Sequence, residues 1–132
     1  MAKKKILFAC VGNCCRSQMS EGFGRSLAGD KFEIYSAGSN PAGFVHPEAI
    51  AAMAEVGIDI SGQYSKGFMD LPVKEVDVLV TMGCGETCPA IPAKQRINWE
   101  IKDPIGLPID VFRKVRDDLR TRIEELFKGL YG

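Results

Sequence analysis

Residues 5–17 read Lys-Ile-Leu-Phe-Ala-Cys-Val-Gly-Asn-Cys-Cys-Arg-Ser, and this stretch decides the fold. An apolar run ends at Cys10, five residues follow, and Arg16 stands where a helical pattern begins. A short run without polar interruption predicts a strand buried on both faces, which is typical of a parallel sheet. A loop between such a strand and a helix N-terminus can turn its backbone N–H groups inward, where the helix dipole adds positive potential. The stretch therefore predicts a loop that binds a tetrahedral oxyanion.

The residues of this loop have separate expected roles. Cys10 is the expected nucleophile, because a field that binds an anion also stabilises a thiolate. Arg16 offers a planar, two-pronged donor to an oxyanion, while Ser17 can hydrogen-bond the Cys10 sulfur or cap the helix. Gly12 and Asn13 suit the unusual backbone angles of such a loop. The residues expected to bind the oxyanion are Val11, Gly12, Asn13, Cys14, Cys15 and Arg16.

Apolar runs and amphipathic runs alternate along the rest of the chain, which predicts an α/β fold with a parallel sheet and helices on both faces. The predicted elements are strands over 5–10, 32–36 and 76–81 and helices over 17–28, about 47–56 and a final segment with a core-facing stripe from 111 to 127. Arg116 is expected on the solvent side of that last helix. Residues 83–108 are rich in Gly and Pro without clear periodicity, and are predicted to form a long functional loop. Residues 1–132 are expected to form a single domain.

Composition excludes several classes of function. Seventeen basic and seventeen acidic side chains cancel, so neither nucleic acid nor an anionic membrane is an expected partner. No apolar stretch approaches the roughly 20 residues that cross a bilayer, and no signal peptide precedes the first strand, so a cytoplasmic protein is expected. Five cysteines in a reducing compartment favour catalytic or redox thiols. With His46 the only histidine, a zinc site would consume the loop cysteines, and neither a metal nor a bound cofactor is expected.

Beyond the first loop, three further segments carry a family resemblance: Ser17–Gly22, Tyr35–Gly38 and Asp103–Pro104. In this order and spacing they resemble the low-molecular-weight tyrosine phosphatase superfamily, which includes the thioredoxin-coupled arsenate reductases. The resemblance runs from about residue 4 to the end of the chain. It implies a domain with a four-stranded parallel sheet, and it implies that Asp103 is the general acid that protonates a departing oxygen.

Cys84 and Cys88 favour the reductase branch, since phosphatases need no second pair of thiols. Gly83 and Gly85 beside them ease the local change of shape that a disulfide between these two residues requires. The resemblance implies that Cys10 attacks arsenate, Cys84 then attacks Cys10 as arsenite leaves, and Cys88 finally attacks Cys84. The two later cysteines stand closer together than in the best-known reductases. Thioredoxin is the expected external reductant, and a low-molecular-weight thiol is the alternative.

Two other functions stay open on the sequence. A protein tyrosine phosphatase would form a phosphocysteine on Cys10, and aromatic pocket walls would come from Phe44, Tyr64, Phe68 or Trp99. A non-catalytic thiol sensor or metalloid-binding protein would need neither Arg16 nor Asp103. The expected ligands are arsenate, with phosphate or sulfate as competing oxyanions, bound by a monomer. Cys14 and Cys15 are read as packing thiols of the loop, one of which can protect Cys10 as a disulfide under oxidation.

Some reductases of this branch bind potassium beside the loop, and the resemblance places Asn13, Glu21 and Ser36 at matching ligand positions. Lys66 stands where those enzymes carry a carboxylate. A lysine ammonium can occupy the same negative pocket, so we expect activity without potassium.

Overall fold

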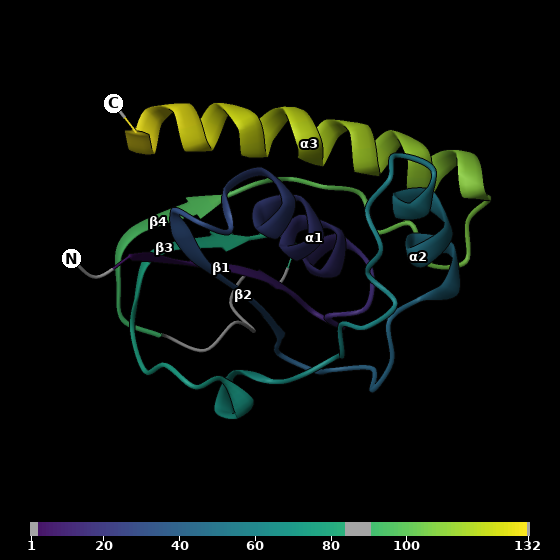
Figure 1. Cartoon of the computed structure of the whole chain (residues 1–132). Helices are drawn as coiled ribbons and strands as arrows, with labels where there is room; N and C mark the ends of the chain where they lie inside the picture. The colour runs from purple at the N-terminus through teal and green to yellow at the C-terminus, as the bar shows by residue number, and fades with distance from the viewer. Residues whose placement is uncertain (1–2, 84–90, 132) are drawn as a thin grey trace.

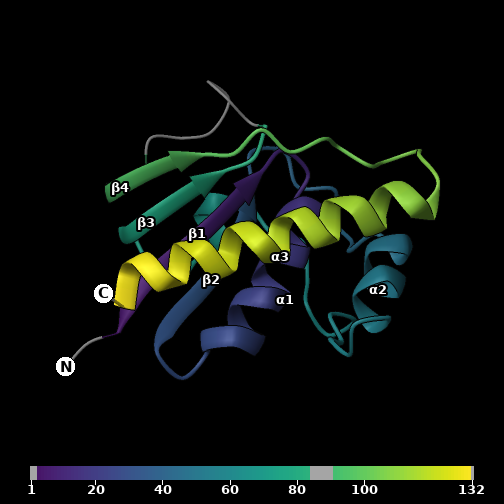
Figure 2. The ribbon, with the colours of Figure 1, turned by 90° about the horizontal axis from the view of Figure 1, so that it is seen from above.

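The computed structural model describes residues 3–83 and 91–131. The six predicted strands and helices occur in the predicted order, and the structure adds a fourth strand and a short 3-10 helix. The elements are β1 (Lys4–Cys10), α1 (Arg16–Ala28), β2 (Phe32–Gly38), α2 (Pro47–Ala54), the short 3-10 helix η1 (Phe68–Asp70), β3 (Val76–Thr81), β4 (Ala93–Asn98) and α3 (Ile109–Tyr131). Figure 1 shows them as a sheet with α3 running along its upper side, and Figure 2 shows α3 crossing the strands when seen from above.

Within the described residues the strands form a sheet of order β2-β1-β3-β4, and every pairing is parallel. The predicted four-stranded parallel sheet is confirmed. Residues 6–10 of β1 are all buried between two neighbouring strands and two covered faces, which explains a run with no polar alternation. Because the strands are parallel, their carboxyl ends meet at one edge of the sheet. There Cys10 pairs with Gly38 of β2, and the preceding Ala9 pairs with Thr81 of β3.

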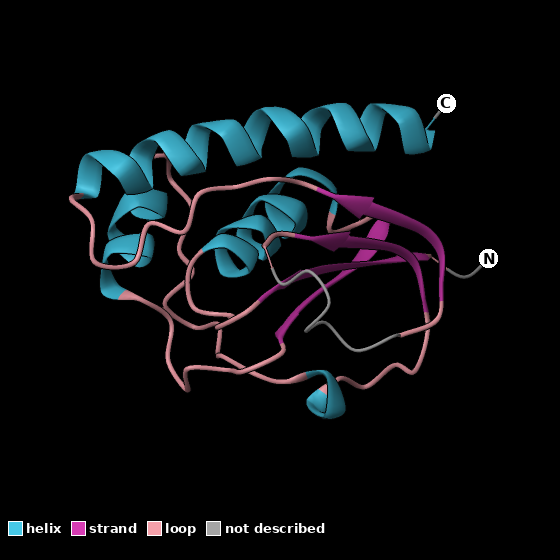
Figure 3. Ribbon diagram, turned by 180° about the vertical axis from the view of Figure 1, so that it is seen from behind, coloured by secondary structure: helices cyan, strands magenta, loops and turns pink. Residues whose placement is uncertain are grey.

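The two faces of the sheet are covered differently. Ile6 and Phe8 point into a core shared with α1, α2 and α3, whereas Leu7 and Ala9 point to the opposite face. On that face the cover comes from η1 and the chain around it, with Phe68 packed against the cluster. Figure 3 shows η1 on the opposite side of the sheet from α3. The expectation of helices on both faces is therefore corrected: among the described residues the three α-helices share one face, and the other carries a single 3-10 turn.

β4 is the second correction, because it lies inside the segment 83–108 that the sequence predicts as a loop. Its sequence, Ala-Lys-Gln-Arg-Ile-Asn, has no buried residue, since β4 is an edge strand with one neighbour. Charged side chains along an edge discourage pairing with another sheet. They also remove the apolar run by which a strand is recognised in sequence.

The predicted solvent-facing position of Arg116 is the third expectation that the structure corrects. The apolar stripe of α3 is buried as predicted, but Arg116 is 9% exposed instead of facing solvent. Its Nη1 donates to the carbonyl of Ala52 at 2.9 Å and to Glu55 Oε1 at 2.8 Å. Arg113 and then Arg116 hold the pKa of Glu55 at about 2 through these hydrogen bonds. This network ties α2 to α3, so the Arg116 guanidinium holds the two helices together.

No helix among the described residues is long and apolar enough to cross a membrane.

Candidate active site

The loop of residues 10–16, called the cradle below, turns its carbonyl oxygens away from its centre. They accept hydrogen bonds from the chain beside it: Ser39 N to Cys10 O (3.3 Å), Asn40 N to Val11 O (2.9 Å), Ala42 N to Gly12 O (2.9 Å), Gln18 Nε2 to Asn13 O (3.1 Å) and His46 N to Cys14 O (2.9 Å). In a trans peptide the N–H points opposite to the C=O. The N–H groups of residues 11–15 therefore face the inner side of the cradle, as oxyanion binding requires.

Asn13 takes the strained conformation of the cradle. Its φ is +46°, in the left-handed region, whereas Gly12, for which the same was expected, does not enter that region. Asparagine tolerates this conformation better than most residues. Gln18, which sequence reasoning did not single out as part of the site, donates to Asn13 Oδ1 at 2.9 Å and is fully buried. A fully buried polar residue on the first turn of a helix becomes recognisable only once the fold is known.

Gly38 lies so close to the cradle that only glycine fits. A Cβ there would be 2.5 Å from the carbonyl oxygen of Val11 and 2.9 Å from the amide nitrogen of Asn13. Both are backbone atoms, so neither can rotate aside. The end of β2 therefore holds the cradle from outside.

Gly38→Ala is expected to push the cradle out of shape. Overpacking of this kind costs about 1–3 kcal/mol, and we expect both a lower free energy of unfolding and weaker phosphate binding. Urea unfolding and calorimetric titration with phosphate measure the two effects. Gly62→Ala is the control, because an added methyl there meets nothing within 4 Å. Identical behaviour of the two variants would contradict the close contact.

Cys10 and Ser17 meet as the sequence predicts. The Cys10 side chain is buried, and its Sγ lies 2.9 Å from Ser17 Oγ. Ser17 Oγ accepts a hydrogen bond from Asn13 Nδ2 at 2.7 Å, which leaves its own proton for the sulfur. Helix α1 begins one residue earlier, at Arg16, so Ser17 is in the first turn and does not act as the helix cap. A hydroxyl donated to sulfur favours the thiolate.

Arg16 and Asp103 also lie close together, although they are 87 positions apart in the sequence. The Arg16 guanidinium is buried; its Nη1 donates to the carbonyl of Ile101 at 3.2 Å, and its Nη2 lies 3.7 Å from Asp103 Oδ2. Half of the Asp103 side chain is exposed, which puts its carboxylate at the boundary between Arg16 and solvent. A Cβ on Gly83 would be 2.4 Å from Arg16 Nη1, and Gly83 has a φ of +82°. The chain just after β3 is thus in contact with the cradle arginine.

Cys14 and Cys15 are buried neighbours whose Sγ atoms are 3.7 Å apart. The hydrogen bond from Cys15 lowers the pKa of Cys14, and the Arg16 guanidinium adds to this effect against burial and the Asp103 carboxylate. The same hydrogen bond and burial raise the pKa of Cys15. Both sulfurs belong to the core cluster that contains Cys10, in agreement with their reading as packing thiols. A protective disulfide with Cys10 stays a prediction.

Cys84 and Cys88 lie outside the described residues. The expected neighbourhood of their strand is confirmed, because β3 pairs with β1 and Met82 N donates to Ala9 O at 2.8 Å. Gly83, at the cradle, directly precedes Cys84 in the chain.

The four aromatic residues that could wall a phosphotyrosine pocket lie in different environments. Trp99 is 8% exposed and packs on Phe8, with ring centroids 6.3 Å apart. Phe68 packs against the cluster on the other face of the sheet. Phe44 and Tyr64 are about half and two-thirds exposed, respectively. His46 caps α2 by accepting from Glu48 N at 3.2 Å, so the ring of this histidine holds the start of a helix.

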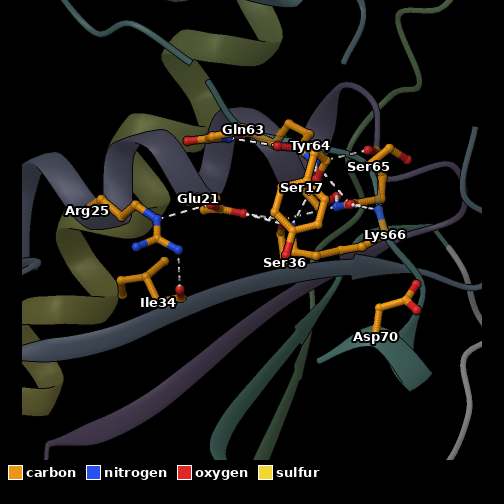
Figure 4. Close-up of polar contacts among 12 residues, drawn as sticks. Ser17, Glu21, Arg25, Ile34, Ser36, Gln63, Tyr64, Ser65, Lys66 and Asp70 are labelled. Atoms are coloured by element: carbon orange, nitrogen blue, oxygen red, sulfur yellow. Dashed lines mark hydrogen bonds and ion pairs between the residues drawn. The ribbon is translucent and has the colours of Figure 1, made fainter. Parts of the chain in front are cut away.

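Lys66 occupies the pocket that the sequence assigns to it. Its Nζ lies 3.3 Å from Glu21 Oε1, 3.3 Å from Ser36 Oγ and 3.1 Å from the carbonyl oxygen of Tyr64 (Figure 4). Within residues 3–83 and 91–131, no group of three or more His, Cys, Asp or Glu side chains is arranged to hold a metal ion.

Comparison with known proteins identifies relatives over most of the chain. The family model for low molecular weight phosphotyrosine protein phosphatases matches residues 5–131. Arsenate reductase 2 of Staphylococcus epidermidis is 42% identical over 127 residues, which cover 94% of this chain and 96% of that protein. A glutaredoxin arsenate reductase of Synechocystis is 43% identical over 126 residues, covering 93% of this chain and 95% of that protein.

Solved structures of arsenate reductases have a fold similar to that of this chain. An arsenate reductase in the phosphate binding state has a TM-score of 0.87 and 40% identity, covering 96% of this chain and 98% of the other. A thioredoxin-dependent arsenate reductase of Corynebacterium glutamicum has a TM-score of 0.83 and 33% identity, covering 98% of this chain and 62% of the other.

Proposed function

This chain belongs to the low molecular weight phosphotyrosine protein phosphatase family, and within that family we propose that it reduces arsenate to arsenite by a thiol-disulfide cascade. The observation that carries the proposal is the contact of Gly83 with Arg16, because the next residue is Cys84. The described chain therefore reaches the cradle arginine one position before the sequence supplies a second thiol. The relatives at 42% and 43% identity, which are named arsenate reductases, support the same activity.

The first step is the attack of Cys10 on bound arsenate. The inward N–H groups of residues 11–15 and the Arg16 guanidinium hold the oxygens, and the Ser17 hydroxyl stabilises the Cys10 thiolate. An S–As bond forms and one As–O bond breaks. The departing hydroxide takes a proton from Asp103 and leaves as water. Phosphate and sulfate have the same shape and compete for the cradle.

The second step transfers electrons. The Cys84 thiolate attacks the Cys10 sulfur, an S–S bond forms and the S–As bond breaks. The electron pair of that bond stays on arsenic, which becomes As(III) and leaves as arsenite. Cys88 then attacks Cys84, which frees Cys10 and leaves a Cys84–Cys88 disulfide. Each exchange is a thiolate displacement at sulfur.

An external thiol reductant closes the cycle, and thioredoxin is the reductant that we propose. The thioredoxin-dependent relative supports it, while the glutaredoxin-named relative keeps a glutathione-based system as the alternative. We propose that the chain acts as a monomer in the cytoplasm, where free thiols stay reduced.

The test is arsenate-dependent oxidation of NADPH with purified protein, thioredoxin and thioredoxin reductase, run beside glutaredoxin with glutathione. Turnover in the first system supports thioredoxin, and turnover in the second alone transfers the role to glutaredoxin. Brisk hydrolysis of para-nitrophenyl phosphate without arsenate turnover in either system would overturn the reductase and leave the phosphatase.

Slow ester hydrolysis is a second activity that the pairing of Asp103 with Arg16 favours, since a carboxyl group beside the bound anion is what protonates a leaving alcohol. Asp103→Asn is expected to lower the kcat of para-nitrophenyl phosphate hydrolysis by about 10²–10⁴-fold, the usual contribution of a positioned acid. Lys102→Asn, at the neighbouring exposed position, is the control. Equal rates in the two variants would remove Asp103 from the chemistry.

A further inference from the structure

Cys14 and Cys15 are a pair of thiols that the proposed cascade does not use. In that cascade Cys10 attacks the oxyanion, and its Sγ is hydrogen-bonded to Ser17 Oγ. The exposed fractions of Cys14 and Cys15 are 3% and 2%, and neither residue is in a disulfide. The pair therefore remains available for a second reaction.

The separation of the two sulfurs suits an atom that bridges them. The Sγ atoms are 3.7 Å apart, which is far longer than the bond of about 2.05 Å in a disulfide. A soft centre bonded to both sulfurs needs them close to van der Waals contact, and they already lie there. Because both thiols are in place before a ligand arrives, the second bond forms within the molecule and requires little further ordering.

The groups around the pair indicate which kind of centre fits. Thiolates favour soft centres. A structural zinc ion takes four protein ligands, but the described residues offer no group of three or more His, Cys, Asp or Glu side chains that could hold a metal ion. Trivalent arsenic needs three bonds, and it can keep one hydroxyl while two thiols replace the others. Two neighbouring sulfurs therefore fit trivalent arsenic better than a metal ion.

The two thiols are also prepared unequally for bonding. The hydrogen bond from Cys15 lowers the pKa of Cys14, against burial and the nearby Asp103 carboxylate. The same hydrogen bond, together with burial, raises the pKa of Cys15. Cys14 thus supplies a thiolate that attacks, whereas Cys15 keeps a proton for a departing hydroxyl group.

Cys14 is the sulfur that a ligand meets first. A Cβ built on Gly12 would be 3.2 Å from Cys14 Sγ, so this sulfur lies against a residue that has no side chain. Gly12 is itself partly exposed, whereas the residues on both sides of Cys14 are buried. Partly exposed backbone is therefore in contact with the thiol that attacks.

We propose that Cys14 and Cys15 together bind trivalent arsenic, the oxidation state in which arsenite is released. The Cys14 thiolate displaces hydroxide from arsenous acid and forms the first S–As bond. Cys15 forms the second S–As bond, and its proton leaves with another hydroxyl as water. Arsenic keeps one hydroxyl and stays trivalent throughout, so neither an oxidant nor a reductant is needed. The site goes beyond the proposed function, because it binds arsenite whether or not the chain reduces arsenate.

The experiment titrates the Cys84→Ala/Cys88→Ala protein with arsenite and counts bound arsenic by native mass spectrometry. This background removes the two thiols outside the cradle. One arsenic per chain is expected, with the mass of arsenous acid less two waters. Adding Cys14→Ser or Cys15→Ser is expected to raise the Kd by about 10²-fold or more, since the gain from linking two binding groups is lost. Cys10→Ser in the same background is the matched control and is expected to bind arsenite as before.

Three results of this titration would overturn the proposal. They are no binding in the background protein, unchanged affinity after Cys14→Ser or Cys15→Ser, and loss of binding after Cys10→Ser. Calorimetric titration with phosphate shows which variants keep a folded cradle.

A second measurement needs no substitution. Phenylarsine oxide, whose arsenic has two positions for thiols, is added to the unsubstituted protein, and the excess is removed before digestion with trypsin. The peptide of residues 6–16 contains all the cradle cysteines, and its fragment ions locate the adduct. A bridge between Cys14 and Cys15 is expected, whereas a bridge that includes Cys10, or an unmodified peptide, would overturn the site. Neither measurement uses arsenate, so failure of arsenate reduction and failure of this site are separate results.

Discussion

Replacing Cys10 with serine is expected to abolish arsenate reduction and phosphate-ester hydrolysis together, by roughly 10⁴-fold or more, the scale on which loss of a nucleophile acts. Both reactions begin with a bond from the Cys10 sulfur to the bound oxyanion. A serine hydroxyl stays protonated at neutral pH, and an oxygen in this position cannot form the disulfide that reduces arsenic. Ser17, whose proton is directed at the sulfur at 2.9 Å, cannot supply the missing nucleophilicity.

The fold is expected to survive this change, because serine differs from the buried Cys10 by one atom and the cradle is held by its backbone. Calorimetric titration with phosphate checks this, and binding within a few-fold of the unsubstituted protein is the expected result. The rates come from the coupled NADPH assay and from para-nitrophenyl phosphate. Measurable turnover of either substrate by a serine variant that binds phosphate would assign the nucleophile to another residue.

Cys84→Ala is expected to separate the two reactions. Arsenate turnover should fall to background, because no second thiolate is available to take Cys10 from arsenic. Ester hydrolysis should change little, since water completes that reaction. The coupled assay and the ester assay, run on the same preparation, measure both. Full arsenate turnover by this variant with thioredoxin would show that the cascade does not pass through Cys84.

Cys88→Ala is the companion variant, because it acts one step later. A single equivalent of arsenate should still yield arsenite and leave a Cys10–Cys84 disulfide, which peptide mass spectrometry detects. The same experiment on Cys84→Ala should leave no disulfide at Cys10. Trapping in the first variant but not the second establishes the order of the thiols.

Much of the fold was predictable because its signals are local. A continuous apolar run predicts a buried strand, and this holds for β1 and β3. β3 has the predicted bounds, and β1 begins one residue earlier than predicted. The helix stripe of α3 is equally local. β4 escaped prediction because an exposed edge strand carries charged residues and no apolar pattern. The second face of the sheet was predicted to carry helices, but a strand buried on both sides does not indicate what covers it.

The sequence alone determined the chemistry of the cradle. Cys10, the five residues after it and Arg16 are contiguous, so the geometry of a strand, a tight loop and a helix N-terminus suffices to bring a thiol, inward N–H groups and a guanidinium together. Only the tertiary structure decided the partners of that cradle. Asp103 reaches Arg16, and Lys66 reaches Glu21, across long stretches of chain. Such contacts depend on how whole elements pack against each other, and the spacing of residues along one segment contains no information about which distant side chain will fill the space beside it.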